Sequence, residues 1–270
     1  ARVSALFCAM IISSVNIVRM LLESGADPKI SDMNGADPFI YASVMGRVQN
    51  IKLWLSRFPR WNINRGTTLN GSSALHAAVY FGRNKLQTVQ ALVELGGADL
   101  NVLNHGGASV LSNAVDSVDS NVDVVRYLLS KRLKYGVNYR RQAQTTKYQF
   151  MYGLARGLLR TRVATSSLLL ELAYASGATP LQYAAQRGDI EVVELLMEHG
   201  AEPSIKNDMG RDVLSYCKAF PEIKTAIERV KRENERVHGG ISATATRETS
   251  HAGTVTSTTK RPKDFTLQRR

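Results

Sequence analysis

The side chains best suited to chemistry in this sequence are its two cysteines and five histidines, since thiolates and imidazoles act as nucleophiles, bases and metal ligands. They are Cys8, Cys217, His76, His105, His199, His238 and His251. Their spacing matches no metal-ligand motif and no disulfide framework. The glycine-rich phosphate loop, the dinucleotide-binding glycine motif and the nucleophile elbow are also missing from the sequence. We therefore predict that the chain is not an enzyme and that it has no cofactor and no metal site.

Lysine and arginine side chains are the second group that could bind a ligand, in this case an anion. Residues 130–170 contain nine of them and no Asp or Glu: Lys131, Arg132, Lys134, Arg140, Arg141, Lys147, Arg156, Arg160 and Arg162. Residues 231–270 add nine basic and four acidic residues. These two stretches together exceed the net charge of +12 for the whole chain. The basic character is therefore local, and the remaining sequence is slightly acidic.

The elements that would position these side chains follow a repeating pattern. A pair of large apolar residues precedes a Gly-Ala-Asp-like turn in LLESGADP (21–28), LVELGGADLN (92–101) and LLMEHGAEP (195–203). Looser copies of this pair begin at residues 54 and 128. Before each pair lies a segment with small residues at fixed places, such as SALHAAV (73–79) and TPLQYAA (179–185). A fixed period of this length indicates a repeat architecture, in which each unit buries its apolar face by stacking on its neighbours.

These residues resemble the ankyrin repeat, whose pattern is close to G-x-T-P-L-H-x-A-A-x-x-G, then V-V-x-x-L-L, then G-A-D. Residues 177–205 match nearly throughout, although Gln182 replaces the usual His. Residues 71–101 keep His76, but the pattern needs small insertions before Leu92 and at Gly97. The resemblance covers roughly residues 1–130 and 176–230. It implies an all-α solenoid of stacked helix-turn-helix units joined by hairpin-like loops.

The sequence favours an ankyrin-repeat domain over 1–233 and a tail over 234–270. We place the repeats at about 1–30, 31–64, 70–103, 104–138 and 176–206, with a C-terminal capping repeat at 207–233 and a basic insertion or degenerate repeat at 139–175. Because the chain begins at Ala1 in the middle of a repeat, we expect it to be a fragment of a longer protein. The tail is rich in Ser, Thr and Gly and has few apolar residues, which predicts disorder.

The physical chemistry of the best repeat agrees with this interpretation. Thr179 is suited to cap a helix and Pro180 to occupy its first turn. Ala184 and Ala185 are small enough for two helices to approach closely, and Gly188 suits the left-handed backbone that ends a helix. His76 falls where the ankyrin pattern has a histidine that bonds to neighbouring backbone, so we assign it a structural role.

The segment at 139–175 leaves several interpretations open. Phe150, Met151, Leu154 and Leu158 share one helical face between arginines. Our preferred prediction is a degenerate or insert-bearing repeat that stacks within the solenoid. Alternatives are a basic amphipathic helix that binds calmodulin or an anionic membrane surface, or a nucleic-acid surface on which interleaved tyrosines stack on bases. The candidate basic patch consists of Arg140, Arg141, Lys147, Arg156, Arg160 and Arg162. We do not favour nucleic acid or membrane as the partner.

What the ankyrin resemblance implies about function is protein binding through the concave face and the loop tips. The candidate contact residues are positions expected to be exposed beside the packed ones, and Tyr, Phe and Arg among them are typical of binding hot spots. They are Tyr41, Met45, Tyr80, Phe81, Arg83, His105, Asn113, Tyr183, Gln186, Arg187, Met209, Arg211 and Tyr216. The alternative function is a regulatory ankyrin segment of a larger enzyme or channel, such as a kinase, acyltransferase or ubiquitin ligase.

The cellular location follows from two further observations. Two unpaired cysteines suggest a reducing compartment, and no apolar run approaches the length needed to cross a bilayer. We expect an intracellular protein, cytoplasmic or nuclear.

Overall fold

The computed structural model describes residues 4–117, 119, 121–161 and 166–248, and for 237–248 it describes the backbone alone. The chain divides into two compact units, 1–230 and 231–270. The boundary falls inside the last helix, α13 (Pro221–Glu248). All regular secondary structure in the described ranges is helical.

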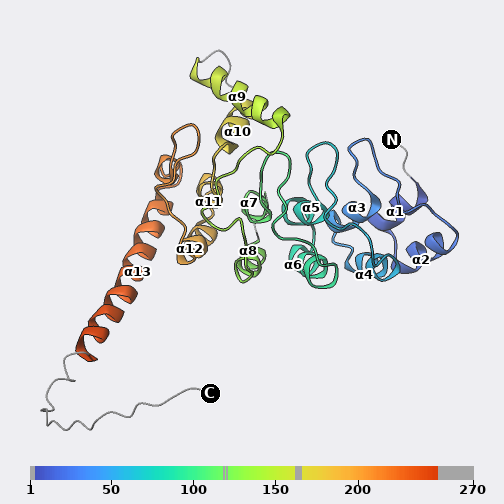
Figure 1. Ribbon diagram of the computed structural model, residues 1–270, viewed down its shortest axis with the longest axis horizontal. Helices are drawn as coiled ribbons and strands as arrows, with labels where there is room; N and C mark the ends of the chain where they lie inside the picture. Colours follow the sequence, from blue (N-terminus) through green and yellow to red (C-terminus); the bar gives the residue numbers. More distant parts are fainter. Residues whose placement is uncertain (1–3, 118, 120, 162–165, 249–270) are drawn as a thin grey trace, which may run out of the picture. The chain divides into compact units, whose positions relative to one another are not determined.

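Most helices of the first unit form antiparallel pairs that follow one another in a row (Figure 1). The pairs are α1 (Ala5–Ile12) with α2 (Val15–Glu23), α3 (Pro38–Val44) with α4 (Val48–Arg57), α5 (Ala74–Phe81) with α6 (Lys85–Gln90), α7 (Val110–Val115) with α8 (Val122–Leu129), and α11 (Pro180–Arg187) with α12 (Ile190–Glu198). The first members of the pairs form one layer, which we call the inner helices. The second members form the other layer, the outer helices. This arrangement confirms the predicted all-α ankyrin solenoid.

The inner helices begin at residues that the sequence marks as caps. The side chains of Asp37, Ser73, Ser109 and Thr179 each accept a hydrogen bond from the backbone N–H three residues later. Such a cap satisfies one of the unpaired donors of the first helical turn and stabilises the helix by about 1 kcal/mol. Gly188 ends α11 with φ of 75°, in the left-handed region.

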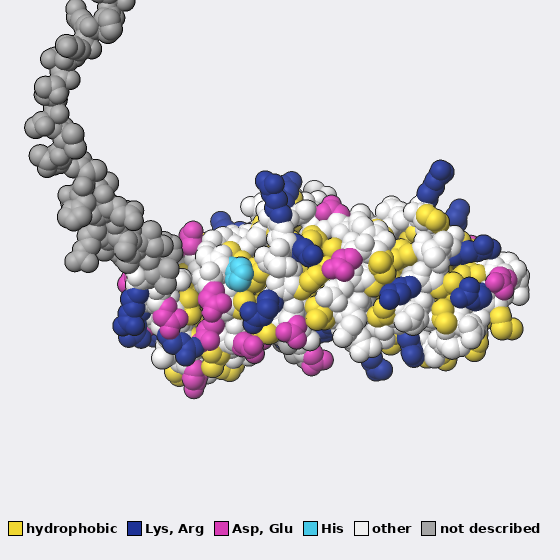
Figure 2. Space-filling view, turned by 90° about the horizontal axis from the view of Figure 1, so that it is seen from below, with side chains coloured by type: hydrophobic (Ala, Val, Ile, Leu, Met, Phe, Trp, Pro, Cys, Tyr) yellow, Lys and Arg dark blue, Asp and Glu magenta, His cyan; other side chains and the backbone are white. Residues whose placement is uncertain are grey.

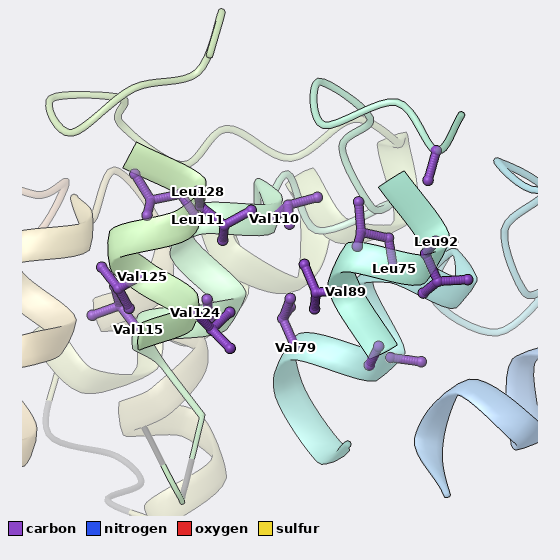
Figure 3. Packing of buried hydrophobic residues seen from close by; sticks show 14 of the residues in the cluster. Leu75, Val79, Val89, Leu92, Val110, Leu111, Val115, Val124, Val125 and Leu128 are labelled. Atoms are coloured by element: carbon purple, nitrogen blue, oxygen red, sulfur yellow. The ribbon is translucent and has the colours of Figure 1, made fainter. Parts of the chain in front are cut away.

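The core lies between successive pairs and consists mainly of aliphatic side chains. Figure 3 shows Leu75 and Val79 of α5 and Val89 of α6 facing Val110 of α7 and Val124 of α8. All five are fully buried. Burying such a side chain contributes about 1.5–3 kcal/mol, so each pair is stabilised chiefly by its neighbours.

The third outer helix is irregular where the repeat pattern needs an insertion. Residues Ala91–Leu95 continue α6 as a single π-helical turn, η1. A π-turn absorbs one extra residue within a helix, and Gly97 follows it at φ of 65°. The predicted insertions before Leu92 and at Gly97 are therefore accommodated without shifting Leu92, which remains fully buried.

The hairpin loops between pairs share one closing geometry. In the loop before α7, the backbone N–H of Asn104 donates to the carbonyl of Ala108 (3.2 Å), and that of Gly107 donates to the carbonyl of Asn104 (2.9 Å). Asp32 with Gly35, and Asn207 with Gly210, repeat this pattern around a two-residue tip. These glycines have φ near 78°, a backbone conformation that favours glycine over other residues.

The loop between α8 and α11 has the same closure around a much longer tip. The backbone N–H of Arg141 donates to the carbonyl of Ala178 (2.9 Å), and that of Gly177 donates to the carbonyl of Arg141 (2.8 Å). Gly177 has φ of 74°. Residues 142–176 therefore take the place of a two-residue hairpin tip, and we call them the tip insertion.

The tip insertion contains two helices, α9 (Thr146–Arg160) and α10 (Ser167–Ala175), which pack chiefly on each other. They leave the row above α7 and α11 in Figure 1. Helices α11 and α12 pack directly on α7 and α8. The preferred prediction that 139–175 stacks within the solenoid is therefore wrong. The physical reason is the closure at Arg141 and Gly177, which lets the flanking repeats meet as if the tip were short.

The C-terminal end of the row differs from the other repeats. The expected inner helix of the capping repeat is a short 3₁₀ turn, η2 (Val213–Ser215), after which α13 begins at Pro221. Ile223, Ile227 and Val230 of α13 are buried. The tail was predicted from residue 234, and the helix-forming stretch KRENER (231–236) carries α13 past this position; the backbone of α13 is described to Glu248. Residues 249–270 lie outside the described part of the chain.

The closure geometry leads to a prediction about the tip insertion. Replacing residues 142–176 by Met33 and Asn34, the tip of the first hairpin, should leave the row folded. Shortening the loop reduces the entropy cost of closure by about 2–3 kcal/mol, and this gain offsets the packing that α9 and α10 provide. Circular dichroism and urea denaturation should show one cooperative transition, and a molten or insoluble variant would contradict the prediction.

Candidate binding groove

A groove of about 1130 Å³ runs along the inner helices beneath the hairpin tips. Its floor comes from α3, α5, α7 and α11, and its rim from the hairpins that precede them. At one end the tip insertion adds a wall, formed by Tyr148 and Tyr152 of α9 and by one face of α10. A groove of this size is large enough to hold a ligand.

The groove brings together part of the predicted contact set. Its lining includes Tyr41, Tyr80, Phe81, Asn113, Tyr183, Gln186 and Arg187. Phe81 is 67% exposed and its ring lies edge-on to Tyr80, with centroids 4.6 Å apart. Contrary to the expectation of exposure, Asn113 and Tyr183 are buried. Asn113 on α7 and Tyr183 on α11 are buried because these two helices pack directly on each other.

The other predicted contact residues lie outside the groove lining: Met45, Arg83, His105, Met209, Arg211 and Tyr216. Several of them have contacts within the chain. The His105 ring faces Tyr148 at 6.5 Å, and the Arg211 guanidinium lies 4.1 Å from the centre of the Tyr174 ring. Tyr216 packs against the hydrophobic core.

Two arginines in the groove are held by partners within the chain. Arg187 donates to Asp116, with which it forms an ion pair at 3.2 Å. Burial raises the pKa of Asp116, and the Arg187 charge opposes that rise. Arg141 donates to the Gly106 carbonyl and to the Tyr183 hydroxyl, each at 3.0 Å. Burial raises the pKa of Tyr183 to about 12, so its hydroxyl stays protonated at neutral pH.

Sequence reasoning missed the residues that α10 contributes to the groove. Leu168, Glu171, Leu172 and Ala175 line it, and their spacing of three and four residues places them on one helical face. Only this periodicity within SLLLELAYA (167–175) could have indicated the face. The position of this face of α10 beside the groove depends on the hairpin closure between Arg141 and Gly177, and Arg141 lies more than twenty residues before α10.

The arginines of the predicted basic patch converge on one carboxylate. Asp208, at the next hairpin tip, forms ion pairs with Arg140 (2.8 Å) and Arg156 (2.9 Å) and accepts from the Ser176 hydroxyl (2.5 Å). Arg160 donates to the Asp208 backbone carbonyl at 3.4 Å. The arginines therefore tie the tip insertion to the last hairpin.

The remaining members of the patch are differently placed. Arg141 lies in the groove, Lys147 is exposed on α9, and Arg162 lies outside the described residues. The patch is therefore not one free surface for an anionic ligand.

The charge on the rest of the array is not uniformly basic. Figure 2, which views the row from below, shows Asp and Glu gathered over the C-terminal half, with Lys and Arg spread along the length. In the ranges that the structure covers, no helix is long and apolar enough to cross a bilayer. The same ranges contain no cluster of His, Cys, Asp and Glu side chains able to hold a metal ion.

Models of two ankyrin families match this sequence. The model for three copies of the ankyrin repeat matches residues 52–142, and the model for a single ankyrin repeat matches 176–208. The interval between the two matches is 143–175. It agrees with the tip insertion, 142–176, to within one residue at each end.

Curated proteins similar to this chain include two viral ankyrin repeat proteins and one latrotoxin. The putative ankyrin repeat protein L371 of Acanthamoeba polyphaga mimivirus is 26% identical over 220 residues, covering 78% of this chain and 27% of the relative. The ankyrin repeat domain-containing protein M-T5 of myxoma virus (strain Lausanne) is 22% identical, covering 74% and 42%. Alpha-latrotoxin-Lg1a of Latrodectus geometricus is 33% identical over 129 residues, covering 47% and 9%. The chain thus spans less than half the length of each relative.

Solved structures share the fold. The ankyrin repeat domain of Bcl-3, described as a member of the IkappaB family, superposes with a TM-score of 0.57 at 24% identity, covering 84% of this chain and 81% of that one. The human ASB11 ankyrin repeat domain gives 0.52 at 21% identity, covering 84% and 97%. A chain from the complex of the Bdellovibrio bacteriovorus endopeptidase Bd0816 with its immunity protein Bd3460 gives 0.54 at 18%, covering 85% and 97%. Together, the matched repeats, the stacked helix pairs and the capped inner helices show that this chain contains ankyrin repeats, over 52–142 and 176–208.

Proposed function

We propose that this ankyrin array is a non-catalytic module that binds a segment of a partner protein in the groove along its inner helices. The observation that carries the proposal is the exposed Phe81 ring beside Tyr80 within that groove. An exposed aromatic ring that packs on a half-buried tyrosine in a concave site is typical of a binding hot spot. Ankyrin repeats are protein–protein interaction modules, and one of the structural neighbours is a chain from a complex of an endopeptidase with an immunity protein.

The chemically capable side chains near the groove support a role without catalysis. His76 is fully buried, faces the Ala108 carbonyl through Nε2 at 3.2 Å and belongs to the cap of α5. The Lys85 ammonium donates to the Ser117 hydroxyl and to the Asp119 carbonyl, each at 2.5 Å. The His76 imidazole and the Lys85 ammonium are therefore both hydrogen-bonded within the chain, through the nitrogen atoms that a catalytic base or nucleophile would use.

A second candidate function is that of a regulatory segment within a larger protein. The chain spans 27% and 42% of two curated relatives, so the same groove could serve a kinase, acyltransferase, ubiquitin ligase or channel. The free thiols of Cys8 and Cys217 support an intracellular location for either function. Both candidates place binding in the groove.

The test compares two exposed apolar side chains, one inside the groove and one outside. Phe81 is 67% exposed and lines the groove, whereas Leu95 is 60% exposed on an outer helix and does not. Phe81→Ala should reduce the capture of specific partners by at least tenfold, corresponding to a loss of about 1.4 kcal/mol or more. Leu95→Ala should leave capture unchanged. Quantitative mass spectrometry of material bound to the immobilised protein is the measurement, and equal losses for both variants would contradict the proposal.

A further inference from the structure

The end of the groove nearest the tip insertion collects carboxylates. Asp116 and Asp119 lie after α7, Asp189 precedes α12, and Glu171 projects from α10, and all four line the groove. They come from three separate parts of the chain. The tip insertion brings Glu171 to the other three, because 142–176 leaves the hairpin above α7 and α11.

The balance of charge at this end is negative. Three basic groups stand near these four carboxylates: Arg141 and Arg187 in the lining, and Lys85, whose ammonium donates to the Asp119 backbone carbonyl. Arg187 is committed to Asp116 through its ion pair. Asp189 accepts from the Val192 backbone N–H, and Glu171 and Asp119 are exposed. In a chain with a net charge of +12, this is a local acidic site within a basic molecule.

Aromatic rings lie along the same stretch of the groove. The rings of Tyr80 and Phe81 form an edge-on pair, and Tyr148 of α9 also lines the groove. A guanidinium or ammonium group near such a ring gains a cation–π contact in addition to its ion pair with a carboxylate. Leu168, 62% exposed on α10, offers an apolar contact next to Glu171 in the lining.

We propose that this acidic, aromatic end of the groove binds a positively charged segment of a partner protein, in which arginine or lysine stands close to an apolar residue. The proposal rests on the proposed function and names the chemistry of its partner. The basic side chain pairs with Glu171 and Asp119, and the apolar residue contacts Leu168 and Phe81. A nucleic acid is disfavoured here because its phosphates would meet carboxylates, while Arg140 and Arg156 are engaged by Asp208.

The experiment selects peptides from a random library displayed on phage, with the full chain as bait. Parallel selections use Phe81→Ala, Glu171→Gln and, as a matched control, Glu191→Gln. Glu191 is exposed on α12 outside the groove lining, so both glutamine variants change the net charge equally. We expect the wild-type chain and Glu191→Gln to enrich peptides with net positive charge, and Phe81→Ala to enrich none of them.

The strongest peptide is then measured by fluorescence anisotropy. Glu171→Gln should weaken its binding about tenfold and Glu191→Gln less than twofold. Glu171→Arg should recover binding to a peptide whose arginine is replaced by glutamate, because a direct pair tolerates exchange of its charges.

The outcomes separate the two proposals. If the selected peptides depend on Phe81 for binding but are neutral or acidic, the proposal of a positively charged partner is wrong, while the groove remains a binding site. No peptide dependent on Phe81 would overturn both. A labelled single-stranded oligonucleotide bound in a Phe81-dependent manner would overturn the protein partner in favour of nucleic acid.

Discussion

Between pH 7 and pH 4, the wild-type protein should lose about 3 kcal/mol more stability than the His76→Gln variant. Burial lowers the pKa of His76 from 6.5 to about 4. In the folded state His76 therefore stays neutral while the unfolded chain takes up a proton. Because the folded pKa is depressed, this contribution is present above pH 6.5 and disappears as the pH falls toward 4. Urea denaturation followed by circular dichroism at several pH values measures the difference.

Gln182 shows why glutamine is the matched replacement. It occupies the corresponding position in α11, completes the same capping arrangement with Thr179, and donates to the carbonyls of Ile205 (2.7 Å) and Arg211 (3.0 Å). Glutamine has no proton to gain in this range. Other groups, including Asp37 and Asp116, whose pKa values burial raises, titrate in both proteins and cancel in the comparison. Parallel pH profiles for the two proteins would show that His76 does not control the acid response.

Trp54→Ala should lower the free energy of unfolding by about 3–5 kcal/mol, the largest effect expected of a single substitution in this array. Trp54 on α4 is fully buried. Its ring lies 5.0 Å from those of Phe58 and Trp61 and 6.2 Å from that of Phe39. Removal leaves a cavity in the core of the second repeat and deletes three aromatic contacts. Urea denaturation at neutral pH gives the measurement.

Trp54→Phe is the control for this prediction. Among the described residues the Trp54 indole N–H has no hydrogen-bond acceptor, and an unpaired buried donor costs about 1–3 kcal/mol. Phenylalanine removes that donor while filling most of the space, so its cost should be well below that of alanine. If both substitutions cost the same, the effect would not arise from the volume of the ring.

The repeat scaffold is predictable because its signals are local. Thr179 and Gln182 stand three residues apart, as do Ser73 and His76, and each pair forms a capping box in the structure. The structural role predicted for His76 is confirmed by its position at the cap of α5 and its contact with the Ala108 carbonyl. Local spacing fixes the capping contacts, whereas the contact between His76 and Ala108 forms when the next repeat stacks on α5.

The tip insertion was mispredicted because its placement depends on distant residues. The sequence shows a helical face at 147–162 but not that Arg141 pairs with Gly177 and Ala178. Phe150 and Leu154, expected to pack as part of a stacked repeat, are 70% and 49% exposed. The wall of the groove and Glu171 were missed for the same reason. Asp208, which binds three of the arginines, stands too far along the chain for a local pattern to connect them.

The closing bonds of the hairpins make each tip a place where the array can acquire new chain without changing its repeat spacing. Arg141 and Gly177 bond as Asn104 and Gly107 do, although 35 residues stand between the former pair and two between the latter. Evolution can thus alter what the concave surface recognises by lengthening a tip, while the hydrophobic contacts between repeats stay under separate selection. The same separation offers a protein engineer a modular design, in which Asn104 and Gly107, or Asn207 and Gly210, receive a grafted helical pair and the groove acquires a second wall.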